Sequence, residues 1–193
     1  MVLAIPNGGI PVGLPVAQAM RSPLEIVPFR RLQLPLATKP IFGYVSILGN
    51  LHLNQPLIGQ NRISQTEIYQ IAKKERQQLE RDFNAWGIEP PLSLLQKTVL
   101  ITDDGMHSGW TMFSAIQTVK KLGASKIVAA VPVTHFRAHR FVGNHCNEII
   151  SLVTEDIALY QIENYYAEFP DFSNDEIREI LRQVSPGPHQ SAA

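Results

Sequence analysis

Two adjacent carboxylates, Asp103 and Asp104, are the residues of this 193-residue chain whose type and spacing point most clearly to chemistry. They follow a short apolar run rich in β-branched residues, 99–102, which predicts a buried strand. After them come a glycine-containing loop and then Ser-Gly-Trp-Thr at 108–111, which opens an amphipathic segment typical of a helix. Because open α/β sheets bind ligands at the carboxyl ends of their strands, both acids are expected at a ligand-binding edge.

The start of the expected helix suits an anion such as a phosphate. Its first backbone N–H groups are free, the helix dipole favours negative charge, and Ser108 and Thr111 add hydroxyl donors. The two acids on the other side of the loop can hold hydroxyl groups or a metal ion. A ligand that carries both a cis-diol and a phosphate, such as a phosphorylated ribose, would therefore satisfy both halves of the loop.

Residues 99–111, Val-Leu-Ile-Thr-Asp-Asp-Gly-Met-His-Ser-Gly-Trp-Thr, resemble the phosphoribosyl-diphosphate motif of the type I phosphoribosyltransferases. By this resemblance Asp103 and Asp104 are the catalytic and metal-binding acids, which hold the ribose hydroxyls directly or through Mg²⁺. The resemblance assigns the 5′-phosphate to the loop residues Gly105, Met106, His107, Ser108, Gly109, Trp110 and Thr111.

Other readings of the same residues stay open. Paired acids after an apolar strand also occur in receiver-like and metal-dependent phosphatase sheets, and Asp-Asp-Gly alone is a common turn. A hydrolase that acts on phosphorylated sugars through Asp103 would form a covalent aspartyl-phosphate. A regulatory module could also keep the ribose-phosphate cradle and lack turnover.

A second loop, Pro-Asn-Gly-Gly at 6–9, follows an apolar strand expected at 2–5. By itself it is a tight strand-to-helix turn whose glycines allow the backbone to approach an anion closely. It resembles the Pro-Arg-Gly-Gly-x-Pro-Val loop that binds diphosphate in a mostly bacterial branch of these transferases, whose base specificity is unassigned. Asn7 stands in place of the arginine, and a neutral amide holds a diphosphate less firmly than a guanidinium does.

The missing cation could come from an arginine pair, Arg30 and Arg31, placed at the carboxyl end of a strand expected at 24–29. The family usually keeps an Arg-Lys pair there, although two exposed arginines can also be a solvated turn. The resemblance therefore predicts a diphosphate site made of Asn7, Gly8, Gly9, Arg30 and Arg31.

The base is expected near His107 and Tyr160. His107 lies where purine-specific transferases often have an aspartate that assists the base, and a histidine can exchange a proton near neutral pH. Tyr160 belongs to an aromatic-rich segment before the last helix and could stack on a planar heterocycle. A solvent-facing histidine and a core tyrosine are the alternatives. Trp110 replaces a smaller residue, and its side chain could point away, pack on the lid or block the loop.

The rest of the chain follows an α/β pattern. We expect further strands at 41–47, 51–53, 126–133 and 148–153, and helices at 64–86, 111–122 and from 173. The strands at 41–47 and 51–53 read as a hairpin, and residues 43–62 are the expected lid over the diphosphate. His135 and His139 are spaced as helical zinc ligands, but no carboxylate completes the set and neighbouring arginines disfavour a cation.

Composition narrows the class further. Lysine plus arginine equals aspartate plus glutamate at 17 each, so nothing indicates a nucleic-acid or membrane partner. The single cysteine, Cys146, excludes an intrachain disulfide, and no signal peptide is evident, which favours a cytoplasmic protein. We expect one phosphoribosyltransferase-like domain over residues 1–184 and a disordered tail at 185–193.

The resemblance thus implies an α/β fold with a mainly parallel twisted sheet flanked by helices and a small β-hairpin lid. It implies a pentosyltransferase that takes phosphoribosyl diphosphate or a ribose 5-phosphate ligand, Mg²⁺ and a nitrogenous base. Dimers are common in the family, so a homodimer is also implied.

Overall fold

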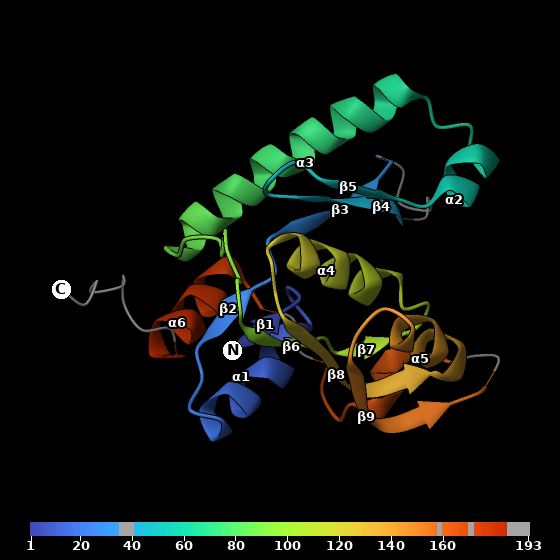
Figure 1. Ribbon diagram of the computed structural model, residues 1–193. Coiled ribbons are helices and arrows are strands. Elements are labelled where there is room, and N and C mark those ends of the chain that lie inside the picture. Colours follow the sequence, from blue (N-terminus) through green and yellow to red (C-terminus); the bar gives the residue numbers. More distant parts are fainter. Residues whose placement is uncertain (35–40, 158–159, 170–171, 185–193) are drawn as a thin grey trace. The chain divides into compact units, whose positions relative to one another are not determined.

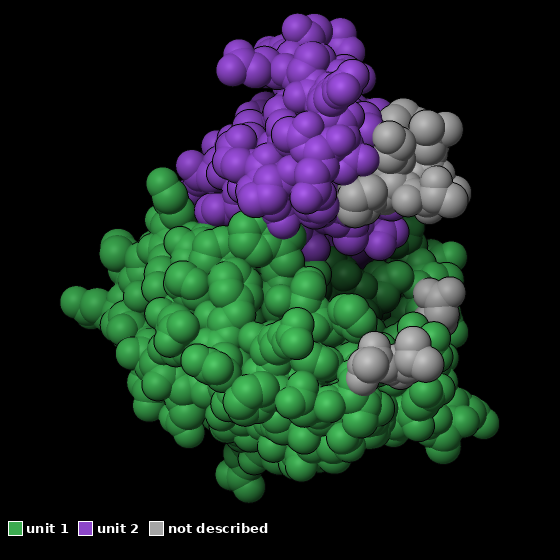
Figure 2. Space-filling view, turned by 90° about the vertical axis from the view of Figure 1, so that its right-hand side faces the viewer, with its two compact units in different colours: residues 1–27, 91–193 green, residues 28–90 purple. Residues whose placement is uncertain are grey.

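The computed structural model describes residues 1–34, 41–157, 160–169 and 172–184 (Figure 1). They divide into two compact units, Met1–Val27 with Pro91–Ala193 as unit 1 and Pro28–Pro90 as unit 2 (Figure 2). The expected tail at 185–193 lies outside the described residues.

Unit 1 is built on a six-stranded parallel sheet whose order is β2-β1-β6-β8, with β7 and β9 also paired to β8. Its strands are β1 Val2–Ala4, β2 Leu24–Ile26, β6 Thr98–Thr102, β7 Gly105–Met106, β8 Lys126–His135 and β9 Glu148–Glu155. Since parallel sheets are covered on both faces, the near-continuous apolar runs of β1 and β6 fit their burial. The expected mainly parallel sheet is confirmed.

The helices of unit 1 are α1 Gly9–Ala19, α4 Trp110–Lys121, α5 Phe136–Gly143 and α6 Asn174–Val184, with a 3-10 turn, η1, at Ile162–Tyr165. Helices α1 and α4 lie on opposite faces of the sheet (Figure 1). The α4 stripe predicted from the sequence, Met112, Ala115, Ile116 and Val119, is fully buried. A Ser173–Glu176 capping box starts α6, because the Ser173 hydroxyl accepts from the Glu176 N–H and the Glu176 carboxylate accepts from the Ser173 N–H.

Strand β9 differs from its prediction as the last core strand. It pairs with β8 along its length but has no second neighbour among the described residues, and Leu152 on it is 83% exposed. An apolar run alone does not distinguish a strand buried on both faces from one with an open face, and this explains the difference.

Unit 2 contains a three-stranded antiparallel sheet, β3-β4-β5, and two helices. Its elements are β3 Phe29–Gln33, β4 Ile41–Ser46, β5 Leu51–Leu53, α2 Gln55–Gln60 and α3 Gln65–Trp86. The predicted hairpin is therefore present as β4 and β5, with β3 added to it. Ser64 and Glu67 form the predicted capping box of α3, and Gly87 ends that helix at a φ of 70°.

The strand expected at 24–29 is two strands, and this corrects the position of the arginine pair. β2 ends at Ile26, β3 begins at Phe29, and the two belong to different sheets. Arg30 and Arg31 therefore lie inside β3 and not at the carboxyl end of a strand. Pro28 separates the two strands, and proline lacks the N–H that a sheet ladder needs.

The described helices include none that is both long and apolar enough to cross a membrane.

Candidate functional site

The two acids lie between two strand segments that pair with the same edge of β8. β6 pairs with residues 126–130 of β8, β7 pairs with residues 133–134, and Asp103 and Asp104 connect them. The Asp103 N–H still donates to the Ala130 carbonyl at 3.4 Å, and the Asp104 N–H donates to Asp103 Oδ1 at 3.0 Å. The pairing on both sides fixes the backbone of this pair at the carboxyl end of β6.

Burial sets the electrostatics of the pair. Asp103 is only 8% exposed, and desolvation followed by the Asp104 charge raises the pKa of its carboxyl well above the usual value. Desolvation also raises the pKa of Asp104, to which the Glu163 charge contributes. A cation bound between the two carboxyls would stabilise their ionised forms.

The turn at residues 6–9 packs directly against these acids. A Cβ placed on Gly8 would overlap Asp104 Oδ2, and one on Gly9 would overlap the Thr102 carbonyl oxygen. The Thr102 hydroxyl donates to the Gly9 carbonyl at 2.9 Å. Only glycine allows this approach, so the structure brings the predicted diphosphate turn and the predicted acids into one site. Asn7 is exposed, and its amide donates to the Phe172 carbonyl at 3.4 Å.

Tyr166 contacts the backbone of Asp104, and the sequence did not predict this role. Its hydroxyl donates to the Asp104 carbonyl oxygen at 2.6 Å. Burial and then the charges of Asp104 and Asp103 raise the pKa of Tyr166 to about 12, so the hydroxyl stays protonated and remains a donor. The 3-10 turn η1, which precedes Tyr166, packs against Gly105, because a Cβ on Gly105 would meet Ile162 at 2.9 Å. The only indication in the sequence was the aromatic-rich segment to which Tyr166 belongs.

The tip of the loop is open. His107 and Ser108 are exposed, and the Ser108 hydroxyl accepts from the Trp110 N–H at 3.3 Å. Gly109 directly precedes the first residue of α4 and has a φ of 75°. This left-handed conformation favours glycine at the position. Thr111 lies in the first turn of α4.

Trp110 packs within unit 1. Its indole stacks on Phe113 of α4, with centroids 5.0 Å apart and an interplanar angle of 17°, and on Phe141 of α5 at 6.0 Å. Phe113 and Phe141 both pack edge-to-face with His145. Of the three orientations left open by the sequence, the structure therefore shows the side chain engaged with α4 and α5.

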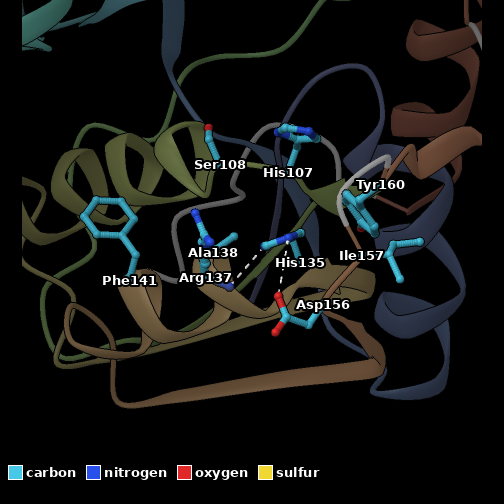
Figure 3. A pocket seen from close by; sticks show the side chains of 9 residues that line it. All are labelled: His107, Ser108, His135, Arg137, Ala138, Phe141, Asp156, Ile157 and Tyr160. Carbon is cyan, nitrogen blue, oxygen red and sulfur yellow. Dashed lines mark hydrogen bonds and ion pairs between the residues drawn. The ribbon is translucent and has the colours of Figure 1, made fainter.

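A pocket of about 760 Å³ opens beside the tip of the loop (Figure 3). Its lining comes from four segments: the loop, the end of β8, α5, and the residues after β9. These residues are His107, Ser108, His135, Arg137, Ala138, Phe141, Asp156, Ile157 and Tyr160. The two residues predicted to face a base, His107 and Tyr160, thus line one pocket, with ring centroids 5.8 Å apart.

The arginine pair lies in unit 2. Arg30 donates from Nε to Glu75 at 2.9 Å and forms a second ion pair with Asp82, both on α3. Asp82 is only 8% exposed, so Arg30 compensates a buried charge within its own unit. Arg31 is exposed on β3. The expected lid at 43–62 also belongs to unit 2, as β4, β5 and α2.

The acids of unit 1 fit a magnesium ion. Mg²⁺ binds through one or two carboxylates and completes its shell with water and substrate phosphates. Among the described residues no cluster of three or more His, Cys, Asp or Glu side chains is placed to hold a metal. Asp103 and Asp104 are the two neighbouring carboxylates that could share such an ion with a bound ligand. The raised pKa values of Asp103 and Asp104 are those of a pair that gains from a nearby cation.

No family model matches the chain. Two Mycobacterium tuberculosis proteins, from strains CDC 1551 and H37Rv and each named "Putative phosphoribosyl transferase", are 27% identical to it over 183 residues. The match covers 94% of this chain and 41% of each relative, so the chain spans about two fifths of their length. The crystal structure of TT1426 from Thermus thermophilus matches with a TM-score of 0.77 and 24% identity, over 96% of this chain and 88% of that one.

The TT1426 match shows a shared fold and carries no statement about activity. The names of the two mycobacterial relatives agree with what the 99–111 loop indicated, and they assign no base. The resemblance of this chain to the phosphoribosyltransferases is therefore confirmed, with base specificity unassigned.

Proposed function

We propose that this chain binds phosphoribosyl diphosphate together with Mg²⁺ and transfers the phosphoribosyl group to a nitrogenous base. The observation that carries the proposal is the Asp103–Asp104 pair held against the Gly8 turn, a few residues before the start of α4. This brings together three groups that such a ligand needs: carboxylates for the ribose hydroxyls, a glycine turn for the diphosphate and a helix N-terminus for the 5′-phosphate.

In the proposed reaction a ring nitrogen of the base forms a bond to C1 of the ribose while the bond from C1 to the diphosphate oxygen breaks. The diphosphate leaves with the bonding electrons, and the base loses a proton. Bound Mg²⁺ would neutralise the charge that develops on the diphosphate. The chain's own contribution is to orient the sugar and to stabilise charge as C1 becomes cationic.

Each segment has a role in this proposal. Asp103 and Asp104 hold the ribose hydroxyls and share the metal, and Tyr166 keeps the Asp104 backbone in place. His107, at the mouth of the pocket, accepts the proton that the base loses. The metal would also lower the pKa values of the two acids and keep both ionised.

Asn7 favours a second candidate, a binding or regulatory module of the same fold. Its neutral amide reaches the Phe172 carbonyl and supplies no charge to a diphosphate. Arg30, which the sequence offered as a replacement for the missing cation, already pairs with two carboxylates of α3. Weak stabilisation of the leaving group would permit binding and slow the transfer.

Calorimetric titration with phosphoribosyl diphosphate, with and without Mg²⁺, tests binding, and a diphosphate-release assay across a panel of bases tests turnover. We expect Mg²⁺-dependent binding that the Asp103→Asn/Asp104→Asn double variant loses. Asp175→Asn, which changes an exposed acid on α6, serves as the matched control and should bind as the wild type does.

Binding without diphosphate release from any base would select the regulatory module. A covalent aspartyl-phosphate on Asp103, detected by mass spectrometry after incubation with a phosphorylated sugar, would select a hydrolase. Absence of binding in the wild type would overturn the proposal.

A further inference from the structure

We infer that the pocket beside the loop selects a base with a lactam edge, a ring N–H next to a carbonyl, over the corresponding amino-substituted base. The inference rests on the proposed function and names the acceptor class that this chain's own side chains would recognise. Its determinants are His135 and Asp156, which no part of the loop motif includes.

The hydrogen bonding of His135 fixes which of its ring nitrogens carries a proton. His135 is the N-cap of α5, and its Nδ1 accepts from the Arg137 N–H at 3.1 Å. A ring nitrogen that accepts a hydrogen bond carries no proton, so the neutral imidazole has its proton on Nε2. His135 therefore presents a hydrogen-bond donor to the pocket.

An acceptor lies beside this donor. Asp156 Oδ1 is 4.0 Å from His135 Nε2, which is ion-pair distance for a protonated imidazole but beyond hydrogen-bond distance, so a neutral His135 leaves both groups available to a ligand (Figure 3). A lactam edge offers the complement, because its carbonyl accepts from Nε2–H while its N–H donates to the carboxylate. An amino-substituted ring presents the reverse pattern, in which the amino group faces the Nε2–H donor and a bare ring nitrogen faces the carboxylate.

Tyr160 contributes an aromatic ring to the pocket lining beside these two groups. The residue is 3% exposed, and within the described part of the chain its hydroxyl has no hydrogen-bond partner. The Tyr160 ring lies 5.8 Å from both the His107 ring and the His135 ring, so the three rings belong to the same wall of the pocket.

The pocket also suits a planar ring in size and in its other walls. Its volume of about 760 Å³ lies in the range of small-molecule sites. Ala138, Phe141 and Ile157 add apolar surface to its lining, and His107, which also lines it, is the residue proposed to accept the proton. The nucleophilic nitrogen must face the sugar, so a base cannot turn freely to exchange its edges.

Two pairs of bases that differ at one exocyclic group test the inference: hypoxanthine against adenine, and uracil against cytosine. Affinity is measured by equilibrium dialysis, with and without phosphoribosyl diphosphate and Mg²⁺. We expect the oxo member of at least one pair to bind about tenfold more tightly, the contribution of roughly one well-made hydrogen bond.

His135→Asn is the informative variant, because asparagine is a good N-cap and keeps the start of α5 while its amide is too short to reach as far as Nε2. It should reduce the preference to within about twofold. Tyr160→Phe keeps the aromatic ring of the lining and should leave the preference unchanged. His139→Asn, on the same helix but outside the pocket lining, is the matched control and should keep the wild-type ratio.

Equal affinities within both pairs, or an amino preference, would overturn the inference. So would an oxo preference that survives in His135→Asn. These results are separate from failure of the proposed function, which would appear as loss of phosphoribosyl diphosphate binding in calorimetry. The dialysis without that ligand still decides the selectivity of the pocket in that case.

Discussion

The two ends of the loop between β6 and α4 are held in opposite ways. At its start, Asp104 is fixed by a glycine turn against its carboxylate and by a tyrosine hydroxyl on its carbonyl oxygen. At its tip, His107 and Ser108 are exposed and face a pocket of about 760 Å³. The start is held by close contacts with the Gly8 turn and Tyr166, whereas the tip is bounded by a pocket lined by side chains from several segments.

This difference separates two tasks. A rigid start positions the part of a ligand that stays the same, here the sugar hydroxyls and a metal. An open tip lets side chains decide what else binds, because the walls can change without disturbing the acids. Substitutions at the start should therefore affect every ligand, and substitutions at the tip should affect selectivity.

The largest effect is expected from Gly8→Ala. Gly8 has ordinary helical angles, φ −58° and ψ −34°, so alanine strains no backbone there and the variant isolates the contact with Asp104. The added Cβ must displace the carboxylate, which should lower the affinity for phosphoribosyl diphosphate and Mg²⁺ by about 100-fold in calorimetry. Gly143→Ala, whose Cβ would meet nothing closer than 3.7 Å, is the matched control. Unchanged affinity in Gly8→Ala would show that the start of the loop is not rigid.

Asp103→Asn should change how stability depends on pH. Because its folded pKa is raised, the Asp103 carboxyl stabilises the fold fully below its unfolded value of about 4 and loses this contribution as pH rises through the folded value. The wild-type free energy of unfolding should therefore fall over that window, by up to about 1.4 kcal/mol per pH unit for one proton. Urea titrations between pH 4 and 9 should show a flatter profile for the variant, which is then the more stable protein at neutral pH.

Asp175→Asn is the control for this measurement, since Asp175 is exposed and should leave the slope unchanged. Mg²⁺ should flatten the wild-type profile, because a cation between the acids stabilises their ionised forms. Parallel profiles for wild type and Asp103→Asn would contradict the burial of this charge.

The sequence predicted the start of the loop better than its tip, for a physical reason. The β6 strand, the acids and the α4 cradle are adjacent in the chain, and their pattern of apolar, acidic and glycine residues follows local rules. The capping box of α3 was predicted for the same reason. The turn at residues 6–9 was assigned to the same site because its glycines allow close backbone approach and because it resembles the diphosphate loop of the family.

Features that depend on distant segments were not predictable. The pocket combines four segments, and nothing local marks His135 or Asp156 as neighbours. Tyr166 was visible only as one of several aromatics, and its partner is a backbone carbonyl 62 residues away. The break at Pro28 was missed because residues 24–29 read as one strand until sheet pairing assigns them to two sheets.

Tyr166→Phe should have a smaller effect than the changes at Gly8 and Asp103. The variant removes the donor to the Asp104 carbonyl, a contribution of about 1 kcal/mol, and should weaken phosphoribosyl diphosphate binding roughly fivefold. The loss should be the same for every base in the dialysis panel, because Tyr166 acts on the start of the loop. Tyr69→Phe, at a 68% exposed position, is the control. A change in base selectivity in Tyr166→Phe would contradict the assignment of selectivity to the tip of the loop alone.

The smallest effect on binding is expected at Trp110, although it lies inside the phosphate loop. Its indole stacks on Phe113 and Phe141, so Trp110→Phe keeps an aromatic partner in that stack and leaves the backbone N–H groups of the cradle unchanged. Affinity for ribose 5-phosphate should stay within about twofold of the wild type, while the melting temperature falls by a few degrees because packing area is lost. Higher affinity in the variant would mean that the indole obstructs the cradle. The loop would then be closed at its tip as well as at its start, and the contrast between them would fail.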